Sequence, residues 1–171
     1  MRRLRYNVAM SLDGCIAGPH GEFDWITADP SIDLGALWKE FDLFVMGRKT
    51  WEVVRAQGDG GLFEGKKLVV FSRTLASVDW PNATVLAEDP ARAVARFKQE
   101  RGKDIWLFGG GILFRTLLDA GLVDAVEIAL MPTLVGGGVP VVATGALHGL
   151  QLVTTKVLPS GVIMLGYGPL R

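Results

Sequence analysis

Short apolar runs alternate along the chain with stretches in which apolar residues recur at every third or fourth position. A short apolar run is typical of a buried strand, and the wider spacing is typical of an amphipathic helix. The runs predict strands at residues 4–10, 43–46, 68–71, 83–86, 105–108, 123–131, 150–158 and 162–167. The wider spacing predicts helices at about residues 49–56, 90–100 and 112–120. A further helix is expected after Pro30, with Leu34, Leu37, Trp38 and Phe41 on one face.

Strand and helix patterns follow one another in turn, which predicts an α/β fold with helices layered on a sheet. The last two strands are joined through Pro159-Ser160-Gly161, so we expect them to form an antiparallel pair. The predicted architecture is a mixed, mostly parallel central sheet with flanking helices and an antiparallel carboxyl-terminal strand pair. Residues 57–67 are polar and rich in glycine and are expected to form a loop. Because no linker divides the chain, residues 1–171 are expected to form one domain.

Composition narrows the function classes. The chain has 171 residues, of which 49% are hydrophobic, and its 18 Lys and Arg balance 18 Asp and Glu. A net charge of zero argues against global attraction to nucleic acid or to an anionic membrane, and no apolar run is long enough for a membrane span. A single cysteine, Cys15, excludes an internal disulfide and favours a cytoplasmic protein. With only His20 and His148 beside it, no metal site is expected.

A glycine turn stands between a predicted strand and a predicted helix at Gly109-Gly110-Gly111. Such a turn exposes backbone N–H groups beside the positive end of the helix dipole, and glycine lets an anion approach the main chain closely. The turn could equally be a tight connection that binds nothing. It is not the Rossmann fingerprint, because Phe114 stands where the third glycine would be, and the chain has no Walker A loop.

Two further strand ends carry chemistry suited to phosphate. The strand at 43–46 leads into Gly47-Arg48-Lys49-Thr50, and the strand at 68–71 leads into Ser72-Arg73. Guanidinium, ammonium and hydroxyl groups all bind phosphate oxygens, and ligands of open α/β sheets bind at the carboxyl ends of the strands. Three such strand ends together predict a phosphorylated nucleotide as ligand.

Several segments carry a likeness to a known family, and the likeness spans nearly the whole chain. These segments are NVAMSLDGCIAG at 7–18, WIT at 25–27, VMGRKTWE at 45–52, GGG at 109–111, GLVD at 121–124, Pro132 and LVGGG at 134–138. In order and spacing they resemble the dihydrofolate reductase superfamily. The closest branch is the reductase domain of the bacterial bifunctional riboflavin-biosynthesis deaminase–reductase, with its stand-alone relatives.

The resemblance implies a three-layer dihydrofolate reductase-like fold and NADPH as the hydride donor for a small heterocyclic substrate. It also implies a homodimer, with the carboxyl-terminal strands as candidate interface. Residues bordering the nicotinamide would be Ala9 and Ile16. The cofactor phosphates would be held by Gly47, Arg48, Lys49, Thr50, Ser72 and Arg73, and the opposite side would be lined by Gly109, Gly110, Gly111, Ile112 and Leu113.

Hydride transfer to a C=N or C=O bond also requires a proton at the heteroatom. Asp33 lies at the margin of a predicted helix face and is one candidate, although an acid there also suits the helix dipole. Asp13, in the loop expected to cover the nicotinamide, is the other, although it also suits a turn before Gly14. Trp25 is expected to contact substrate by stacking on a flat ring, whereas Trp38 is expected to be core.

Two positions depart from the riboflavin-pathway pattern. Phe108 stands where those reductases usually carry a glutamate, and residues 50–65 do not follow their substrate-phosphate segment. We therefore expect an NADPH-dependent reductase of a pterin- or pyrimidine-like heterocycle, with 5-amino-6-(5-phosphoribosylamino)uracil reduction as the nearest known activity. Dihydrofolate reduction and a nucleotide-binding module without turnover are the alternatives. The chain carries no deaminase zinc motif.

Overall fold

The structure is a computed structural model of the chain and describes residues 1–58 and 61–170. Its helices are α1 (Leu34–Lys39), α2 (Arg48–Gln57), α3 (Pro90–Gln99) and α4 (Gly111–Asp119). Its strands are β1 (Leu4–Ser11), β2 (Cys15–Ala17), β3 (Phe41–Gly47), β4 (Lys67–Phe71), β5 (Ala83–Leu86), β6 (Asp104–Gly109), β7 (Ala125–Met131), β8 (Val139–Pro140), β9 (Leu150–Val157) and β10 (Ile163–Pro169). None of the described helices has the length and apolar character needed to cross a lipid bilayer.

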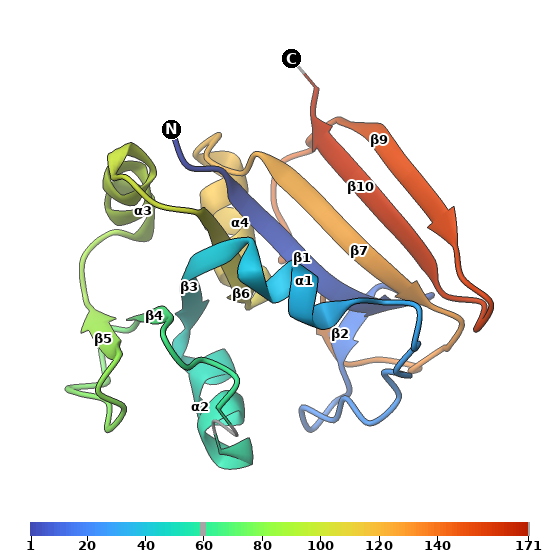
Figure 1. Cartoon of the computed structure of the whole chain (residues 1–171), viewed down its shortest axis with the longest axis horizontal. Helices are drawn as coiled ribbons and strands as arrows, with labels where there is room; N and C mark the ends of the chain where they lie inside the picture. Colours follow the sequence, from blue (N-terminus) through green and yellow to red (C-terminus); the bar gives the residue numbers. More distant parts are fainter. Residues whose placement is uncertain (59–60, 171) are drawn as a thin grey trace.

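Within the described residues, eight strands form one mixed sheet in the order β5-β4-β3-β6-β1-β7-β10-β9 (Figure 1). The pairs from β5 to β7 are parallel, and β10 lies antiparallel between β7 and β9. This confirms the predicted mixed, mostly parallel sheet and its antiparallel carboxyl-terminal pair. A small second sheet, β2 with β8, was not predicted, because two strands of two or three residues leave no periodic signal.

Helices α3 and α4 cover one face of the sheet. Their apolar side chains join those of alternate strand residues in a core that includes Leu4, Tyr6 and Leu107. Tyr6 stacks on Phe114 of α4 with ring centroids 3.9 Å apart, and its hydroxyl donates to the carbonyl of Val141 at 3.0 Å. Burial raises the pKa of Tyr6 well above its ordinary value, so it stays a neutral core residue.

Helices α1 and α2 lie over part of the opposite face, where aromatic side chains gather. Trp38 of α1 is half-buried, and its ring centroid lies 4.7 Å from that of Trp106 on β6. Its indole nitrogen donates to the carbonyl of Leu62 at 2.6 Å. Trp38 therefore belongs to the core, as predicted, and anchors a six-residue helix that packing rather than intrinsic propensity must stabilise.

Several element boundaries differ from the sequence prediction, most clearly at the end of α1. Phe41 was expected on the helix face but begins β3, where it pairs with Asp104 and carries the guanidinium of Arg5 4.6 Å above its ring. The helix ends two residues earlier because that aromatic side chain is buried in the sheet layer. The loop expected at 57–67 contains turns at 61–65, and its residues 59 and 60 lie outside the described part of the chain.

In Figure 1, strands β7, β10 and β9 turn one face to the viewer, and none of the described helices covers that face. This face of β1, β7 and β10 carries half-buried residues of different kinds: Asn7 and Glu127 are polar, Ala9, Ala129 and Gly166 are small, and Met164 opposite Ala129 is large and apolar. Strand β9 at the sheet edge exposes Leu152, Val153 and Val157. The homodimer interface expected on these carboxyl-terminal strands stays a prediction.

Gly138 allows two loops to approach each other closely beside β2 and β8. A Cβ atom on Gly138 would lie 2.1 Å from the carbonyl oxygen of Ala17, and its φ of +149° is strained for any L side chain. Gly136 in the same loop has a φ of +80° but nothing within 4 Å of its Cβ position. Substituting each glycine in turn therefore distinguishes the cost of backbone strain from the cost of steric overlap.

We expect Gly136→Ala to lower the free energy of unfolding by about 1–2 kcal/mol, because a left-handed backbone strains an L residue. Gly138→Ala should lower it by about 2 kcal/mol more, because the added methyl also overlaps backbone that cannot move aside. Urea unfolding of both variants measures the difference. Equal losses would show that the loops do not depend on this close approach.

Candidate nucleotide-binding site at the carboxyl ends of the parallel strands

The sheet changes its direction of winding between β3 and β6. From β3 the chain passes through α2, whose Trp51 and Val54 pack on one face, to the neighbouring strand β4. From β6 it passes through α4, whose Leu113 and Phe114 pack on the other face, towards β7. Parallel strands whose helices leave to opposite faces open a crevice at their carboxyl ends, which is where open α/β sheets bind ligands. In this sheet that point falls between the strand ends at Gly47 and Gly109.

Helices α2 and α4, which begin at these strand ends, both lack a capping side chain. Helix α1 is capped by Asp33 and helix α3 by Asp89, whose carboxylates accept from Ala36 N and Arg92 N at 2.8 and 2.9 Å. Helix α2 begins after Gly47 and helix α4 after Gly110, and among the described residues neither has a side-chain cap. The first-turn N–H groups of two helices are thus left for another acceptor, and the helix dipoles favour an anion.

Close packing at Gly109 brings the two helix starts together. A Cβ on Gly109 would lie 3.3 Å from Cγ2 of Thr50, and one on Gly110 would lie 3.6 Å from its Oγ1. Both glycines have positive φ, +153° and +97°, which other residues adopt only with strain. The backbone therefore favours glycine at both positions, and at Gly109 the space beside Thr50 does so as well. The two predicted turns lie side by side.

A third strand end lies beside them, because β4 is the other neighbour of β3. Ser72 is buried, and its Oγ accepts from the N–H groups of Thr74 and Leu75 at 3.2 and 2.9 Å, which fixes the turn that presents Arg73. Within the described residues, the exposed Arg73 and Lys49 have no ion-pair partner, while Arg48 pairs with Glu52 on the same helix. The structure thus gathers three cations along this edge.

The other predicted cofactor residues fall around the start of α4. Ile112 is 74% exposed, an unusual position for an apolar side chain, whereas Leu113 is buried in the core and offers the site only its backbone N–H. A Cβ on Gly111 would lie 2.6 Å from the carbonyl oxygen of Pro140 on β8. Ile16 lies on β2, which pairs with β8, so it stands beside the same helix start. Ala9 lies on the open face of β1 and pairs with Ala129.

Asp13 holds two loops together. Its carboxylate accepts from Ser11 Oγ at 2.6 Å and from the N–H groups of Val135 and Gly136 at 3.1 and 2.7 Å. The hydrogen bonds from Ser11, Val135 and Gly136 lower the pKa of Asp13 to about 2. Asp13 is therefore ionised at neutral pH and fully engaged as an acceptor, which suits a positioning role better than the proton-donor role suggested by its sequence.

Asp33 and Trp25 lie on the segment that leads into α1. Asp33 is exposed and caps the helix, which is the dipole-related role already open in the sequence. Trp25 is half-buried in the cluster that also includes Ala9 and Ala129, so it borders the open sheet face. The segment is tied to the β9–β10 turn by Asp29, which accepts from the hydroxyls of Ser31 and Ser160, and these bonds lower its pKa to about 2.

The polar pair of Glu127 and Asn7 on that face was not predicted from the sequence. Glu127 of β7 lies opposite Asn7 of β1, accepts from its amide at 3.1 Å, and is paired with the guanidinium of Arg5 at 2.9 Å. A usable signal was present, because an acid and an amide alternate with apolar residues in two adjacent strands. Both runs were predicted to be buried strands, and the polar residues within them were given no role.

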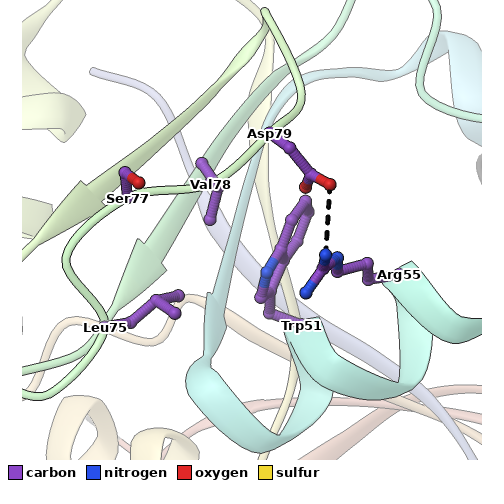
Figure 2. Close-up of a pocket in the computed structure, with 6 residues that line it drawn as sticks. All are labelled: Trp51, Arg55, Leu75, Ser77, Val78 and Asp79. Carbon is purple, nitrogen blue, oxygen red and sulfur yellow. Dashed lines mark ion pairs between the residues drawn. The ribbon is translucent and has the colours of Figure 1, made fainter.

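A hollow of about 220 Å³ lies between α2 and residues 75–79. Figure 2 shows its lining, with Arg55 and Asp79, which pair at 3.2 Å, beside Trp51. A second, of about 540 Å³, lies between Leu34 and Trp38 of α1 and the turn around Leu62. The predicted cofactor residues line neither of them. The chemistry of the strand ends, rather than these surface hollows, therefore locates the candidate site. No cluster of metal-binding side chains occurs in the described residues.

Solved structures of known proteins place this architecture in a class. Dihydrofolate reductase from Enterococcus faecalis, complexed with NADP(H), superposes with a TM-score of 0.72 at 15% identity over 98% of this chain and 96% of its own. A deaminase/5-amino-6-(5-phosphoribosylamino)uracil reductase from Thermotoga maritima superposes with a TM-score of 0.75 at 16% identity over 99% of this chain and 57% of its own. The fold is dihydrofolate reductase-like, as predicted.

Sequence comparison narrows the class to a family. Residues 2–164 match the RibD C-terminal domain, so the chain belongs to that reductase family. The uncharacterized protein YyaP of Bacillus subtilis is 32% identical over 178 residues, which cover 97% of this chain and 94% of that protein. The match to the RibD C-terminal domain confirms the family likeness recognised in the sequence segments.

Acid should release the loop clamp at Asp13. Because the pKa of Asp13 in the fold is about 2 and its ordinary value is 3.8, the clamp is fully present above about pH 4 and is lost as the pH falls through about 2. At neutral pH, Asp13→Asn should speed hydrogen exchange of the Val135 and Gly136 amides. Asp24→Asn, an exposed acid in the loop before α1, is the control and should leave both amides protected. Unchanged exchange in Asp13→Asn would contradict the clamp.

Proposed function

We propose that this protein is an NADPH-dependent reductase of a pterin- or pyrimidine-like heterocycle. The observation that carries the proposal is that two uncapped helix starts, after Gly47 and Gly110, lie at one edge of the sheet, where the exposed Arg48, Lys49 and Arg73 also stand. A dinucleotide pyrophosphate suits two facing sets of backbone N–H groups, and its negative charge matches the two helix dipoles. Membership of the RibD C-terminal reductase family and the NADP(H) complex of the Enterococcus enzyme support the same cofactor.

Different residues of the chain would hold different parts of the cofactor. Backbone groups of Gly47–Thr50 and Gly110–Leu113 would hold the pyrophosphate, while the guanidinium groups of Arg48 and Arg73 would pair with the adenosine 2′-phosphate. The nicotinamide would then reach towards Ala9 and Ile16 at the end of β1. When bound, the cofactor supplies the hydride, and the protein's contribution is to hold the two reacting rings in register and to exclude water.

The substrate ring would lie on the open sheet face beside Ala9. Ala9 and Ala129 would form the floor beneath the ring, and Trp25, Ile32 and Met164 pack around them. The Thermotoga enzyme that shares this fold is a reductase of a substituted aminouracil, which is a ring of the size that such a floor would accept. Because Asp13 and Asp33 are both engaged in hydrogen bonds to backbone N–H groups, we assign delivery of the substrate proton to a water molecule held at the site.

A turnover assay tests the function directly. Loss of NADPH absorbance is followed with dihydrofolate, a dihydropterin and 5-amino-6-(5-phosphoribosylamino)uracil, with product formation confirmed by mass spectrometry. Oxidation of NADPH with the dihydropterin or the aminouracil, but not with dihydrofolate, supports the proposed class. Oxidation with dihydrofolate alone identifies a dihydrofolate reductase. Saturable NADPH binding without oxidation of NADPH in the presence of any of these substrates would show a nucleotide-binding module instead.

Cofactor preference gives a sharper expectation. Replacing Arg73 or Arg48 with Ala should weaken NADPH binding roughly 10- to 100-fold, since each removes a charge-assisted contact to the 2′-phosphate, and should change NADH binding by less than about threefold. Arg55→Ala is the matched control, because Arg55 is on the same helix as Arg48 but pairs with Asp79 away from the crevice (Figure 2).

Isothermal titration of the three variants with NADPH and NADH measures both affinities. Equal losses for the two cofactors would remove the proposed 2′-phosphate role. A loss in Arg55→Ala as large as in Arg73→Ala would move the site from the strand ends to the outer side of α2.

A further inference from the structure

An irregular segment between β8 and β9, residues 141–149, lies along one face of α4, and we call it the strap. Residues of the strap contact the helix at Gly111, Arg115 and Asp119. Helix residues spaced four apart lie on the same face. The strap therefore follows a single face of α4 from the first residue of the helix to the last.

The first of these contacts is at the start of the helix. Ala143 N donates to the carbonyl of Gly111 at 3.2 Å, and a Cβ atom on Gly111 would lie 3.3 Å from the carbonyl oxygen of Val141. The same carbonyl of Val141 accepts from the hydroxyl of the buried Tyr6, which fixes this end of the strap to the core. Because the first turn of α4 has no side-chain cap, its position in the free protein depends on these backbone contacts.

Arg115 makes the second contact, in the middle of the strap. Its side chain is only 13% exposed; one terminal nitrogen donates to the carbonyl of Ala146 at 2.5 Å, and the other lies 3.4 Å from the carboxylate of Asp119. Its Nε has no hydrogen-bond partner among the described residues and lies against Gly145, where a Cβ atom would overlap the guanidinium. The guanidinium is thus enclosed between the helix and the strap and holds the two together.

The third contact is at the end of α4. His148 Nε2 lies 2.7 Å from Asp119 Oδ1, which is the oxygen that Arg115 also approaches. The side chains of His148 and Asp119 are 30% and 45% exposed, and an exposed pair of this kind contributes little to stability. Of the two side-chain attachments, the enclosed Arg115 is therefore the one on which the strap depends.

We propose that Arg115 is a positioning residue of the nucleotide site. It holds the strap, and the strap holds the first turn of α4 in the orientation that receives the cofactor pyrophosphate. The inference rests on the proposed function, because that function places the pyrophosphate at this turn. The guanidinium of Arg115 is occupied by the strap and by Asp119, so it acts through the strap. This separates Arg115 from Arg48 and Arg73, whose charges would pair with the 2′-phosphate.

Two substitutions of Arg115 separate its geometry from its charge. Arg115→Ala releases the strap, and Arg115→Lys keeps the charge but lacks the fork that reaches Ala146 and Asp119 together. Both variants should bind NADPH roughly 5- to 20-fold more weakly, and NADH by the same factor, because the two cofactors share the pyrophosphate. Wild-type affinity in Arg115→Lys, or a loss confined to NADPH, would show an effect of charge and would overturn the proposal.

Arg96→Ala is the matched control, because Arg96 is also a helix arginine paired with an acid, but its partner is Glu88 before α3. Its affinities for both cofactors, measured like the others by titration calorimetry, should stay within about twofold of wild type. A loss in Arg96→Ala as large as in Arg115→Ala would mean that any surface arginine has this effect, and would overturn the proposal as well.

If Arg115→Ala fails to fold, Gly145→Ala decides. Its added methyl would displace the guanidinium, which is the flexible end of a side chain, and the backbone at Gly145 is not left-handed. Gly149→Ala is its control, because the nearest atom to a Cβ there is Cδ1 of Leu170, at 2.7 Å. Weaker binding of both cofactors in Gly145→Ala alone supports the proposal, and wild-type affinities in Gly145→Ala overturn it.

Hydrogen exchange measured without cofactor separates this inference from the proposed function. The amides of Ala143 and Phe114 donate to the carbonyls of Gly111 and Gly110, at 3.2 and 2.9 Å. Both should exchange about fivefold faster in Arg115→Ala, whereas the amide of Ala93 in α3 should not change. Faster exchange in a protein that does not bind NADPH would refute the cofactor and retain the part of Arg115 in holding the start of α4. Unchanged exchange at Phe114 would overturn that part.

Discussion

The parallel pairing of β3 with β6 is the constraint on which the rest of the site depends. Crossover connections between parallel strands are right-handed, so a chain that proceeds from β3 in one direction and from β6 in the other must place its helices on opposite faces. The helix starts after Gly47 and Gly110 then meet at one edge. Neither helix needs a special sequence to reach this position, because the order of the strands sets it.

A second dependence links the site to the interior of the sheet. Arg5 is buried between strands and can remain there only because acids from three elements, Glu40, Asp104 and Glu127, surround its guanidinium. One of these acids is also the best exposed carboxylate on the open face of the central strands. The same ion pair therefore stabilises the packing around Arg5 and keeps a carboxylate at the surface of the sheet.

Much of the fold follows from the sequence, because buried parallel strands such as β4 are continuous apolar runs and Gly121 ends α4 with a positive φ of +66°, as a helix-terminating glycine does. The strand-end residues were predictable for the same reason, since parallel strands end at a common edge. The pairing of β2 with β8 was not predictable, because it depends on contacts between distant loops such as Gly138 against Ala17. The position of Glu127 opposite Asn7 was not predictable either, because it depends on the register of β1 and β7.

The uncapped helix starts have a thermodynamic consequence for the protein in its cell. Groups that no side chain satisfies in the free chain gain an acceptor when an anionic ligand arrives, so the ligand adds to the stability of the folded state. For any ligand that binds only the folded chain, this gain is about 2.7 kcal/mol at a hundred times its dissociation constant. The steady-state amount of a marginally stable protein follows its folded fraction. For the proposed NADPH ligand, the concentration of reduced cofactor in the cell would then set how much of this protein persists.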